Sequence, residues 1–230
     1  MITLALEFSS ALHSAAVARC AADTPPAVLG ESQEEGGRHI RSLELVAGAL
    51  AAAHVEREAV ERIVVGLGPG SLTGIRAAIA LAQGWQLARG VPVLGVSSVE
   101  CLAAQAHALG WHGAVHVVLD AQRGEFFLAG FDISAAGWRA TSALRLASAD
   151  EVASLASSAA LCIGPGAERL GPGGRNLFPH AARLAQLSCG RPASESAENL
   201  EPINLREMHF AKAPAPRLLP RGATGHTSQG

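Results

Sequence analysis

The chain has 230 residues, of which 49% are apolar, and a formal net charge of −2. This length fits one large domain or two small ones, and the apolar content supports a sizeable core and argues against disorder over most of the chain. The near-neutral charge argues against tight, direct binding to nucleic acid, which needs a basic surface that displaces counterions from the phosphates.

Apolar runs and turn residues predict alternating strands and helices in the first half of the chain. Glu7 lies near the turn of the first predicted hairpin, and the polar segment Gln33–Arg38 is a predicted loop. The predicted elements are strands over Ile2–Phe8, Leu12–Cys20, Ala27–Glu31, Arg62–Leu67 and Val93–Val96, and helices over His39–His54, Thr73–Arg89 and Val99–Leu109.

A second cycle of elements follows, and Ser148 is the predicted N-cap of its first helix. The predicted elements are strands over Ala114–Leu119, Glu125–Phe131, Trp138–Leu146 and Leu161–Ile163, and helices over Asp150–Ser157 and Ala181–Cys189. From Pro202 onward the chain is rich in Pro, Arg and Gly, and disorder is predicted for Gly222–Gly230.

Both cycles begin with a strand, an acidic residue, a small polar turn and another strand. The first reads LALEFSS and the second VVLDAQRG. The repeat suggests a duplicated α/β architecture, in which two similar halves face a cleft.

The four cysteines are Cys20, Cys101, Cys162 and Cys189; they are widely spaced and form no CxxC pair. We expect isolated buried thiols in a reducing compartment rather than disulfides or a metal site. No apolar run nears the roughly 20 residues of a membrane span, and no basic segment followed by a long apolar stretch opens the chain. The expectation is a cytoplasmic protein without membrane contact.

A loop suited to close backbone approach precedes the helix over Thr73–Arg89. Gly66–Gly74 contains four glycines together with Pro69, Ser71 and Thr73. The amides of such a loop, at the positive end of a helix dipole, can hold an anion. The Lys of a Walker A loop and the acidic residue of the dinucleotide fingerprint are both missing. Two interpretations remain: an anion-binding loop, or a tight strand-to-helix turn with Thr73 as N-cap.

The helix after this loop carries small side chains on several of its faces. Ala80, Gly84 and Ala88 fall at i, i+4 and i+8, a spacing that lets another helix come close. Because a helix that is apolar on more than one face is covered on more than one face, a second cover is expected, either from this chain or from another protein.

The stretch GPGSLTGIR, at positions 68–76, resembles the GPGSFTGxR signature of the TsaB (YeaZ) family. LALEFSS, GGRHIRSLELV, VVLDAQRGEFFLAGF and EPINLRE follow the family's order, so the resemblance runs from Ile2 to Arg206. The chain departs from the family's usual residues at Glu7 (usually Asp), Leu72 (Phe), Gln83 (Lys) and Asn204 (Tyr).

The resemblance implies an α/β fold of the actin-like, sugar-kinase and Hsp70 (ASKHA) type, with duplicated halves of mixed sheets flanked by helices. The implied division is an N-terminal domain over 1–109 with the partner helices, a smaller C-terminal domain over 110–206 and a flexible tail over 207–230.

The resemblance also implies a non-catalytic subunit of the machinery that makes threonylcarbamoyladenosine beside the anticodon of tRNA. Implied partners are the catalytic paralogue TsaD, the ATPase TsaE and a second copy of the chain when it is alone. Contact with tRNA is implied only through the complex, with ATP or ADP at the TsaD interface as the one candidate ligand.

The resemblance places both pairings on the loop and helices of the N-terminal domain. The partner residues are Gly68, Pro69, Gly70, Ser71, Leu72, Thr73, Gly74, Arg76, Ala77, Ala80 and Gly84. The candidate nucleotide-binding residues are Glu7, Ser9 and Ser10.

No catalytic residue and no metal site are predicted. The catalytic paralogue binds metal through HxxxH on a helix, whereas here Leu43 follows His39 at the second ligand position. His112 and His116 lead into a strand, where four extended residues separate them by roughly 13 Å, too far for one metal ion.

Asp120 and Glu125 flank a predicted turn, and we interpret them as hairpin residues rather than as a catalytic carboxylate pair.

The alternative to a non-catalytic subunit is a stand-alone nucleotide-dependent phosphotransferase of the same superfamily, with Glu7, Ser9 and Ser10 at the phosphates.

Overall fold

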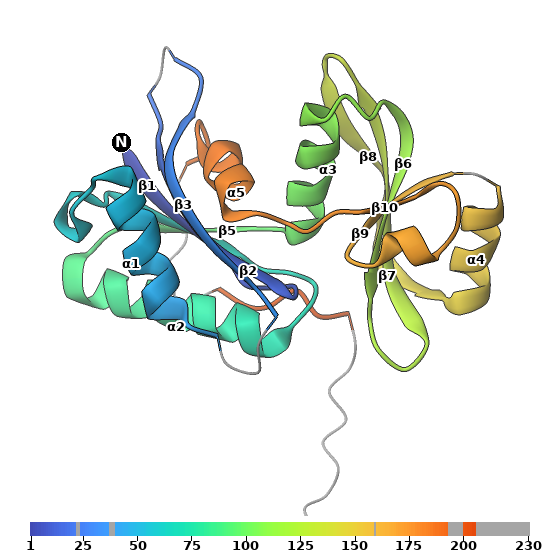
Figure 1. The fold of residues 1–230 in the computed structure, drawn as a ribbon, viewed down its shortest axis with the longest axis horizontal. Coiled ribbons are helices and arrows are strands. Elements are labelled where there is room, and N and C mark those ends of the chain that lie inside the picture. Colours follow the sequence, from blue (N-terminus) through green and yellow to red (C-terminus); the bar gives the residue numbers. More distant parts are fainter. Residues whose placement is uncertain (22–23, 37–39, 159, 193–199, 206–230) are drawn as a thin grey trace, which may run out of the picture.

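The computed structural model describes residues 1–21, 24–36, 40–158, 160–192 and 200–205. Its strands form two five-stranded sheets that stand side by side, each flanked by helices (Figure 1). The elements as far as the last strand of the first sheet are β1 (Ile2–Glu7), β2 (Leu12–Arg19), β3 (Ala27–Glu35), α1 (Ser42–Ala53), β4 (Arg62–Gly66), α2 (Leu72–Arg89) and β5 (Val93–Val96). They are followed by α3 (Ser98–Ala108), β6 (Gly113–Asp120), β7 (Glu125–Ser134), β8 (Gly137–Ser148), α4 (Ala149–Ser157), β9 (Leu161–Gly164), β10 (Gly174–Asn176) and α5 (Ala181–Ser188).

Both sheets have the same topology. The first has the order β3-β2-β1-β4-β5, with antiparallel pairs among β1, β2 and β3 and parallel pairs from β1 through β4 to β5. The second repeats this as β8-β7-β6-β9-β10 with the same pairing directions. The duplicated α/β architecture predicted from the two strand–acid–turn–strand segments is confirmed.

The central strands of the first sheet are buried on both faces because side chains alternate along a strand. Leu4, Leu6 and Ile63 pack in a core with α1 and α2, whereas Ala5 and Val64 pack with α5 on the other face. Within the described ranges, no helix combines the length and apolar character that crossing a membrane requires.

The two halves of the fold exchange one helix each. Helix α3 follows β5, yet Val99, Leu102 and Ala106 of α3 lie in the core of the second sheet. Helix α5 follows β10, yet Ala181 and Leu184 of α5 lie in the core of the first sheet. The chain therefore crosses between the halves before each of these helices (Figure 1). The domain division at residues 109 and 110 stays a prediction, and the predicted tail lies outside the described residues.

The prediction of a loop over Gln33–Arg38 is wrong for its first residues, because β3 continues to Glu35. The strand pairs with β2 along its length, up to the partners Leu12 and Glu35. As β3 is an edge strand, its residues are mostly solvent-accessible, and backbone pairing forms it without an apolar pattern. Helix α1 begins at Ser42, and its predicted first residue, His39, lies outside the described residues.

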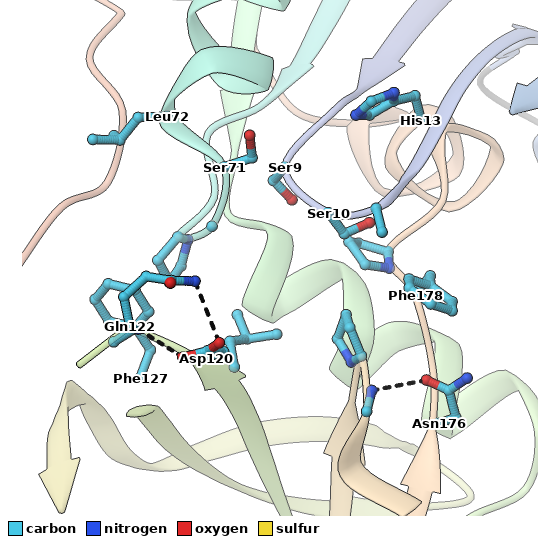
Figure 2. Close-up of a pocket in the computed structure, with 18 of the residues that line it drawn as sticks. Ser9, Ser10, His13, Ser71, Leu72, Asp120, Gln122, Phe127, Asn176 and Phe178 are labelled. Atoms are coloured by element: carbon cyan, nitrogen blue, oxygen red, sulfur yellow. Dashed lines mark hydrogen bonds between the residues drawn. The ribbon is translucent and has the colours of Figure 1, made fainter. Parts of the chain in front are cut away.

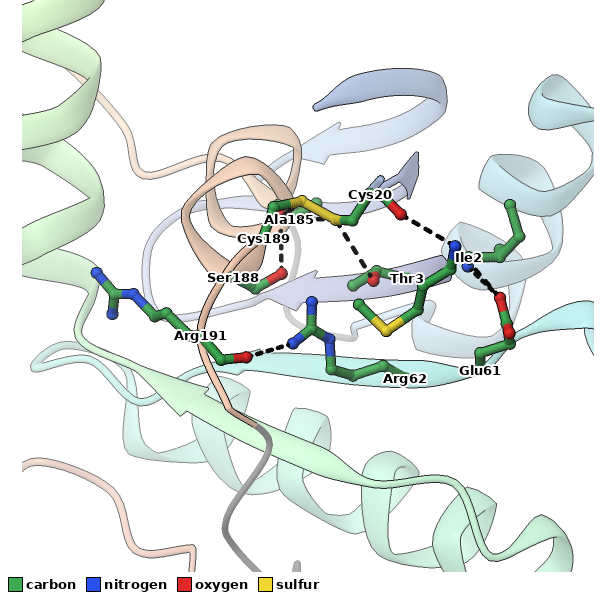
Figure 3. The surroundings of a disulfide bond; sticks show 10 residues. Ile2, Thr3, Cys20, Glu61, Arg62, Ala185, Ser188, Cys189 and Arg191 are labelled. Atoms are coloured by element: carbon green, nitrogen blue, oxygen red, sulfur yellow. Dashed lines mark hydrogen bonds and ion pairs between the residues drawn. A yellow bond between two sulfur atoms is a disulfide. The ribbon is translucent and has the colours of Figure 1, made fainter. Parts of the chain in front are cut away.

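The expectation that all four cysteines are unpaired is also wrong. Cys20 and Cys189 form a disulfide with their Cα atoms 5.5 Å apart (Figure 3). Because α5 returns to the first sheet, its C-cap lies beside the end of β2, although 169 positions separate the two cysteines. Cys101 and Cys162 are buried free thiols.

Candidate partner surface and interdomain cleft

The glycines of the predicted loop let it pack against the first hairpin. A Cβ atom at Gly74 would collide with the backbone carbonyl of Phe8, and a Cβ atom at Gly70 would collide with that of Ser9. Gly70 also has φ +153°, a conformation that side chains disfavour. The close approach that the glycines permit is therefore to the chain's own backbone.

Several amides of this loop already have partners within the chain. Ser71 N–H donates to the carbonyl of Ser9 at 2.7 Å, and Gly68 N–H donates to Ser98 Oγ at 3.1 Å. Gly74 N–H donates to Ser71 Oγ at 3.3 Å, so Ser71, and not Thr73 as predicted, is the N-cap of α2. These contacts favour the tight-turn interpretation over the anion-binding one.

Glu7 lies at the end of β1, fully buried beneath the loop. Its Oε1 accepts a hydrogen bond from Ser9 N–H at 2.8 Å, and its Oε2 accepts one from Ser98 Oγ at 2.7 Å. Gly66 makes room for the carboxylate, because a Cβ atom there would overlap it. Burial raises the pKa of Glu7, and the hydrogen bonds from Ser9 and Ser98 oppose that rise. Glu7 therefore joins β1 to the first turn of α3 and does not face solvent.

Helix α2 buries one face and exposes the other. Ile75, Ala78, Ile79 and Ala82 face the core of the first sheet. Of the predicted partner residues, Ser71, Thr73, Arg76, Ala80 and Gly84 are exposed, Gly70, Leu72 and Ala77 are half-buried, and Gly68, Pro69 and Gly74 are buried. The predicted ridge of small residues is thus on the open face of the helix.

Sequence reasoning missed two leucines near this face. On α2, Leu87 is 91% exposed, and on α1, Leu43 is 70% exposed. Ala47 and Ala51 of α1 are exposed as well, at i+4 and i+8 from Leu43. Helices α1 and α2 cover the same face of the first sheet, and we call their exposed outer sides together the α1/α2 surface. The i, i+4, i+8 spacing in SLELVAGALAAA was the available signal.

A cleft of about 1230 Å³ separates the two halves, at the ends of β1 and β6 (Figure 2). Ser9 and Ser10 line it from the first half, whereas Glu7 does not. Its other polar lining residues include His13, Ser71, Asp120, Gln122, Arg123, Glu168, Arg169, Asn176 and Asn204, beside the rings of Phe127 and Phe178. Burial lowers the pKa of His13. The cleft joins groups from both halves, as the duplicated pattern predicted.

The turn between β6 and β7 has ordinary hairpin hydrogen bonds. Asp120 Oδ1 accepts from Gln122 N–H at 2.6 Å, and Ala121 N–H donates to the carbonyl of Glu125 at 2.9 Å. Gln122 and Arg123 have φ of 66° and 60°, so the turn holds two side chains in the left-handed region. The Asp120 carboxylate supports this turn, which agrees with its structural interpretation.

Two five-stranded sheets of the same strand order, which exchange helices and face a common cleft, define an actin-like (ASKHA) fold. A family model described as TsaD, tRNA N6-adenosine threonylcarbamoyltransferase, matches residues 35–170, more than half of the chain. The structure of YeaZ from Pseudomonas aeruginosa superposes with a TM-score of 0.71 and 27% identity, over 89% of this chain and 99% of that one. The chain belongs to this family, with the TsaB/YeaZ proteins, as GPGSLTGIR predicted.

Curated relatives match over shorter stretches. TsaB of Bacillus subtilis, described as a tRNA threonylcarbamoyladenosine biosynthesis protein, is 32% identical over 88 residues, 38% of each chain. An uncharacterised protein of Mycobacterium tuberculosis strain H37Rv is 39% identical over 84 residues, 36% of this chain and 37% of that one. The matches thus span little more than a third of these relatives' length.

Proposed function

We propose that this chain is a non-catalytic subunit that dimerises with a TsaD-type catalytic subunit and activates threonylcarbamoyl transfer to adenosine beside the anticodon of tRNA. The observation that carries the proposal is the open α1/α2 surface, which lies in a chain of the TsaB/YeaZ family. The names of the relatives supply the reaction, since two of them are called tRNA threonylcarbamoyladenosine biosynthesis protein TsaB.

The α1/α2 surface has the chemistry of a helix-docking site. Nothing lies within 4 Å of a Cβ atom built at Gly84, and Ala80 is exposed one turn earlier, so a partner helix can approach the backbone closely. Leu87 and Leu43 offer apolar area for burial in the pair. Arg76 is exposed, and its guanidinium has no ion pair within the described part of the chain, so it is available to a partner's carboxylate.

A supporting role fits the state of the residues that a catalytic paralogue would use. Glu7 is fully buried, and its two carboxylate oxygens accept hydrogen bonds from Ser9 and Ser98. Leu43 projects into solvent where the second histidine of HxxxH would stand. Both observations support a subunit without catalysis of its own over the alternative, a stand-alone phosphotransferase with Glu7 at the phosphates.

The remaining parts of the proposal concern partners and ligands. Alone, the chain forms a homodimer through the α1/α2 surface; in the complex, that surface meets TsaD, and the ATPase TsaE joins as a further subunit. The chain meets tRNA only through the complex, in the cytoplasm. Ser9 and Ser10 line the cleft and are the candidate contacts for ATP or ADP near the TsaD interface. The Ser9 hydroxyl also donates to Ser98 Oγ at 3.0 Å within the chain.

The test is threonylcarbamoyl transfer to unmodified tRNA by the cognate catalytic subunit, with and without this chain. We expect transfer to require the chain, while the chain alone consumes no ATP. Ala80→Trp is the matched variant, expected to abolish stimulation and to keep the monomer folded. Transfer that is independent of the chain, together with ATP turnover by the chain alone, would overturn the proposal in favour of the phosphotransferase.

A further inference from the structure

The Cys20–Cys189 disulfide fixes the last helix to the first sheet. Cys20 directly follows β2 and is 6% exposed, and Cys189 is the partly exposed C-cap of α5 (Figure 3). The bond closes a covalent loop through both halves of the molecule, because the second sheet lies between the two cysteines in the chain. Its more accessible side is that of Cys189.

Two residues beyond Cys189, Arg191 makes contacts in two directions. Its carbonyl accepts a hydrogen bond at 2.9 Å from Nη1 of Arg62, a buried side chain that opens β4. Its guanidinium forms an ion pair with Glu100 in the first turn of α3, with Nη1 3.3 Å from Oε2. The short segment after α5 therefore connects the first sheet to the helix that packs on the second sheet.

This segment contacts α3 next to one of the two places where the chain crosses between the halves. One crossing directly precedes α3, and Glu100 is the third residue of that helix. The other crossing directly precedes α5, whose end carries Cys189. At that second crossing, Gln105 Nε2 of α3 donates directly to the Phe178 carbonyl at 3.0 Å. Arg191 therefore bears on the first crossing, where it links the first sheet to the start of α3.

Apart from the disulfide, Arg191 is held by a hydrogen bond from its N–H to the Ser188 carbonyl at 3.1 Å and by its contacts with Arg62 and Glu100. The ion pair with Glu100 is about one-third exposed on both side chains, and such pairs stabilise weakly. Within the described residues, Nε and Nη2 of Arg62 have no hydrogen-bond partner. Arg62 therefore binds the Arg191 carbonyl through Nη1 alone. The covalent bond is the strongest of these links.

We propose that the Cys20–Cys189 disulfide is a reversible latch on the start of α3, which it holds to the first sheet through Arg191, and that a dithiol reductant opens it. A thiolate of the reductant attacks Sγ of Cys189, the S–S bond breaks, and Cys20 leaves as a thiolate that takes up a proton. The second thiol of the reductant then loses its proton and attacks the mixed disulfide, and Cys189 is released as a thiol. Two electrons and two protons pass to the cysteine pair, and the reductant becomes a disulfide.

The first measurement counts thiols by alkylation and intact mass of the full chain, denatured under non-reducing conditions. The expected count is two, from Cys101 and Cys162, rising to four after treatment with reduced thioredoxin or dithiothreitol. A count of four in protein purified without reductant and exposed to air would overturn the proposal, as would a bond that neither reductant cleaves in the folded protein.

The second measurement separates a latch from a simple staple. We expect native-state amide exchange in the first turn of α3 to become about tenfold faster in reduced protein and in Cys189→Ser, as for a segment released to open locally. Glu100→Gln, which keeps the disulfide but removes the ion pair, should produce a smaller increase at α3, of at most about fivefold. Cys162→Ser is the control and should change nothing there. Equal α3 exchange in oxidised and reduced protein would refute the latch and leave only a stabilising cross-link.

Discussion

Substitutions at Gly84 separate the stability of the monomer from the strength of its pairing. Gly84 lies inside α2, and a Cβ atom there meets nothing within 4 Å. Gly84→Ala therefore gains helix propensity without a clash, which stabilises the fold by about 0.8–1 kcal/mol. For a chain of this size, that gain raises the unfolding temperature by about 2–4 °C.

Gly84→Trp should act on the pair instead. In the monomer its ring extends into solvent, so the unfolding temperature stays near the wild-type value. In a pair whose helices approach each other at Ala80 and Gly84, the Trp ring has too little space, and such overpacking costs about 1–3 kcal/mol of association free energy per site. That cost corresponds to roughly 5- to 150-fold weaker association.

The assay is sedimentation equilibrium for the homodimer and titration calorimetry for the complex with the catalytic subunit, each beside thermal unfolding. Ala143→Trp is the control, because Ala143 is also exposed but lies on β8 in the other half. Wild-type association by Gly84→Trp would refute the placement of the partner on α2. A loss of stability in Gly84→Ala would refute the open environment of Gly84.

Three further predictions address the loop, the buried carboxylate and the exposed cation. Gly74→Ala should lower the free energy of unfolding by about 2 kcal/mol or more, since the new Cβ atom meets the Phe8 carbonyl and one backbone must shift; an unchanged denaturant midpoint would contradict this. The raised pKa of Glu7 means that the protonated side chain favours folding. The stability of wild type relative to Glu7→Gln should therefore fall as the pH rises above 4.5 through the raised pKa. Urea unfolding of both proteins from pH 4 to 8 measures this difference, and parallel stability profiles would refute the prediction. Arg76→Glu should weaken binding to the catalytic subunit and leave the unfolding temperature unchanged, because Arg76 is exposed; unaltered calorimetry would argue against a partner contact there.

The sequence predicts the order of strands and helices well because the central strands are apolar runs and the turns carry Gly, Pro and Ser. It fails at β3, which is an edge strand with a polar pattern and depends on its pairing with β2. The tight-turn interpretation of the sequence takes Thr73 as the N-cap. Ser71 has that role in the structure, because its hydroxyl accepts a hydrogen bond from Gly74 N–H. Caps depend on side-chain geometry that spacing alone leaves open.

The candidate site is predictable only in part for a similar reason. The ridge at Ala80 and Gly84 follows from helical periodicity, and the structure has both residues exposed. The burial of Glu7 does not follow from periodicity, since it depends on Ser98, 91 residues away in the chain. The disulfide was missed because nothing in the spacing of Cys20 and Cys189 says that α5 returns to the first sheet.

The exchange of α3 and α5 makes the two halves obligate folding partners. A fragment that stops after α3 would leave the α5 side of the first sheet bare and present the apolar side of α3 to water. A fragment that begins at β6 would have the reverse deficiency. Neither piece can satisfy its own core, so the halves should unfold together in one cooperative step, and separately expressed halves should be soluble only when mixed.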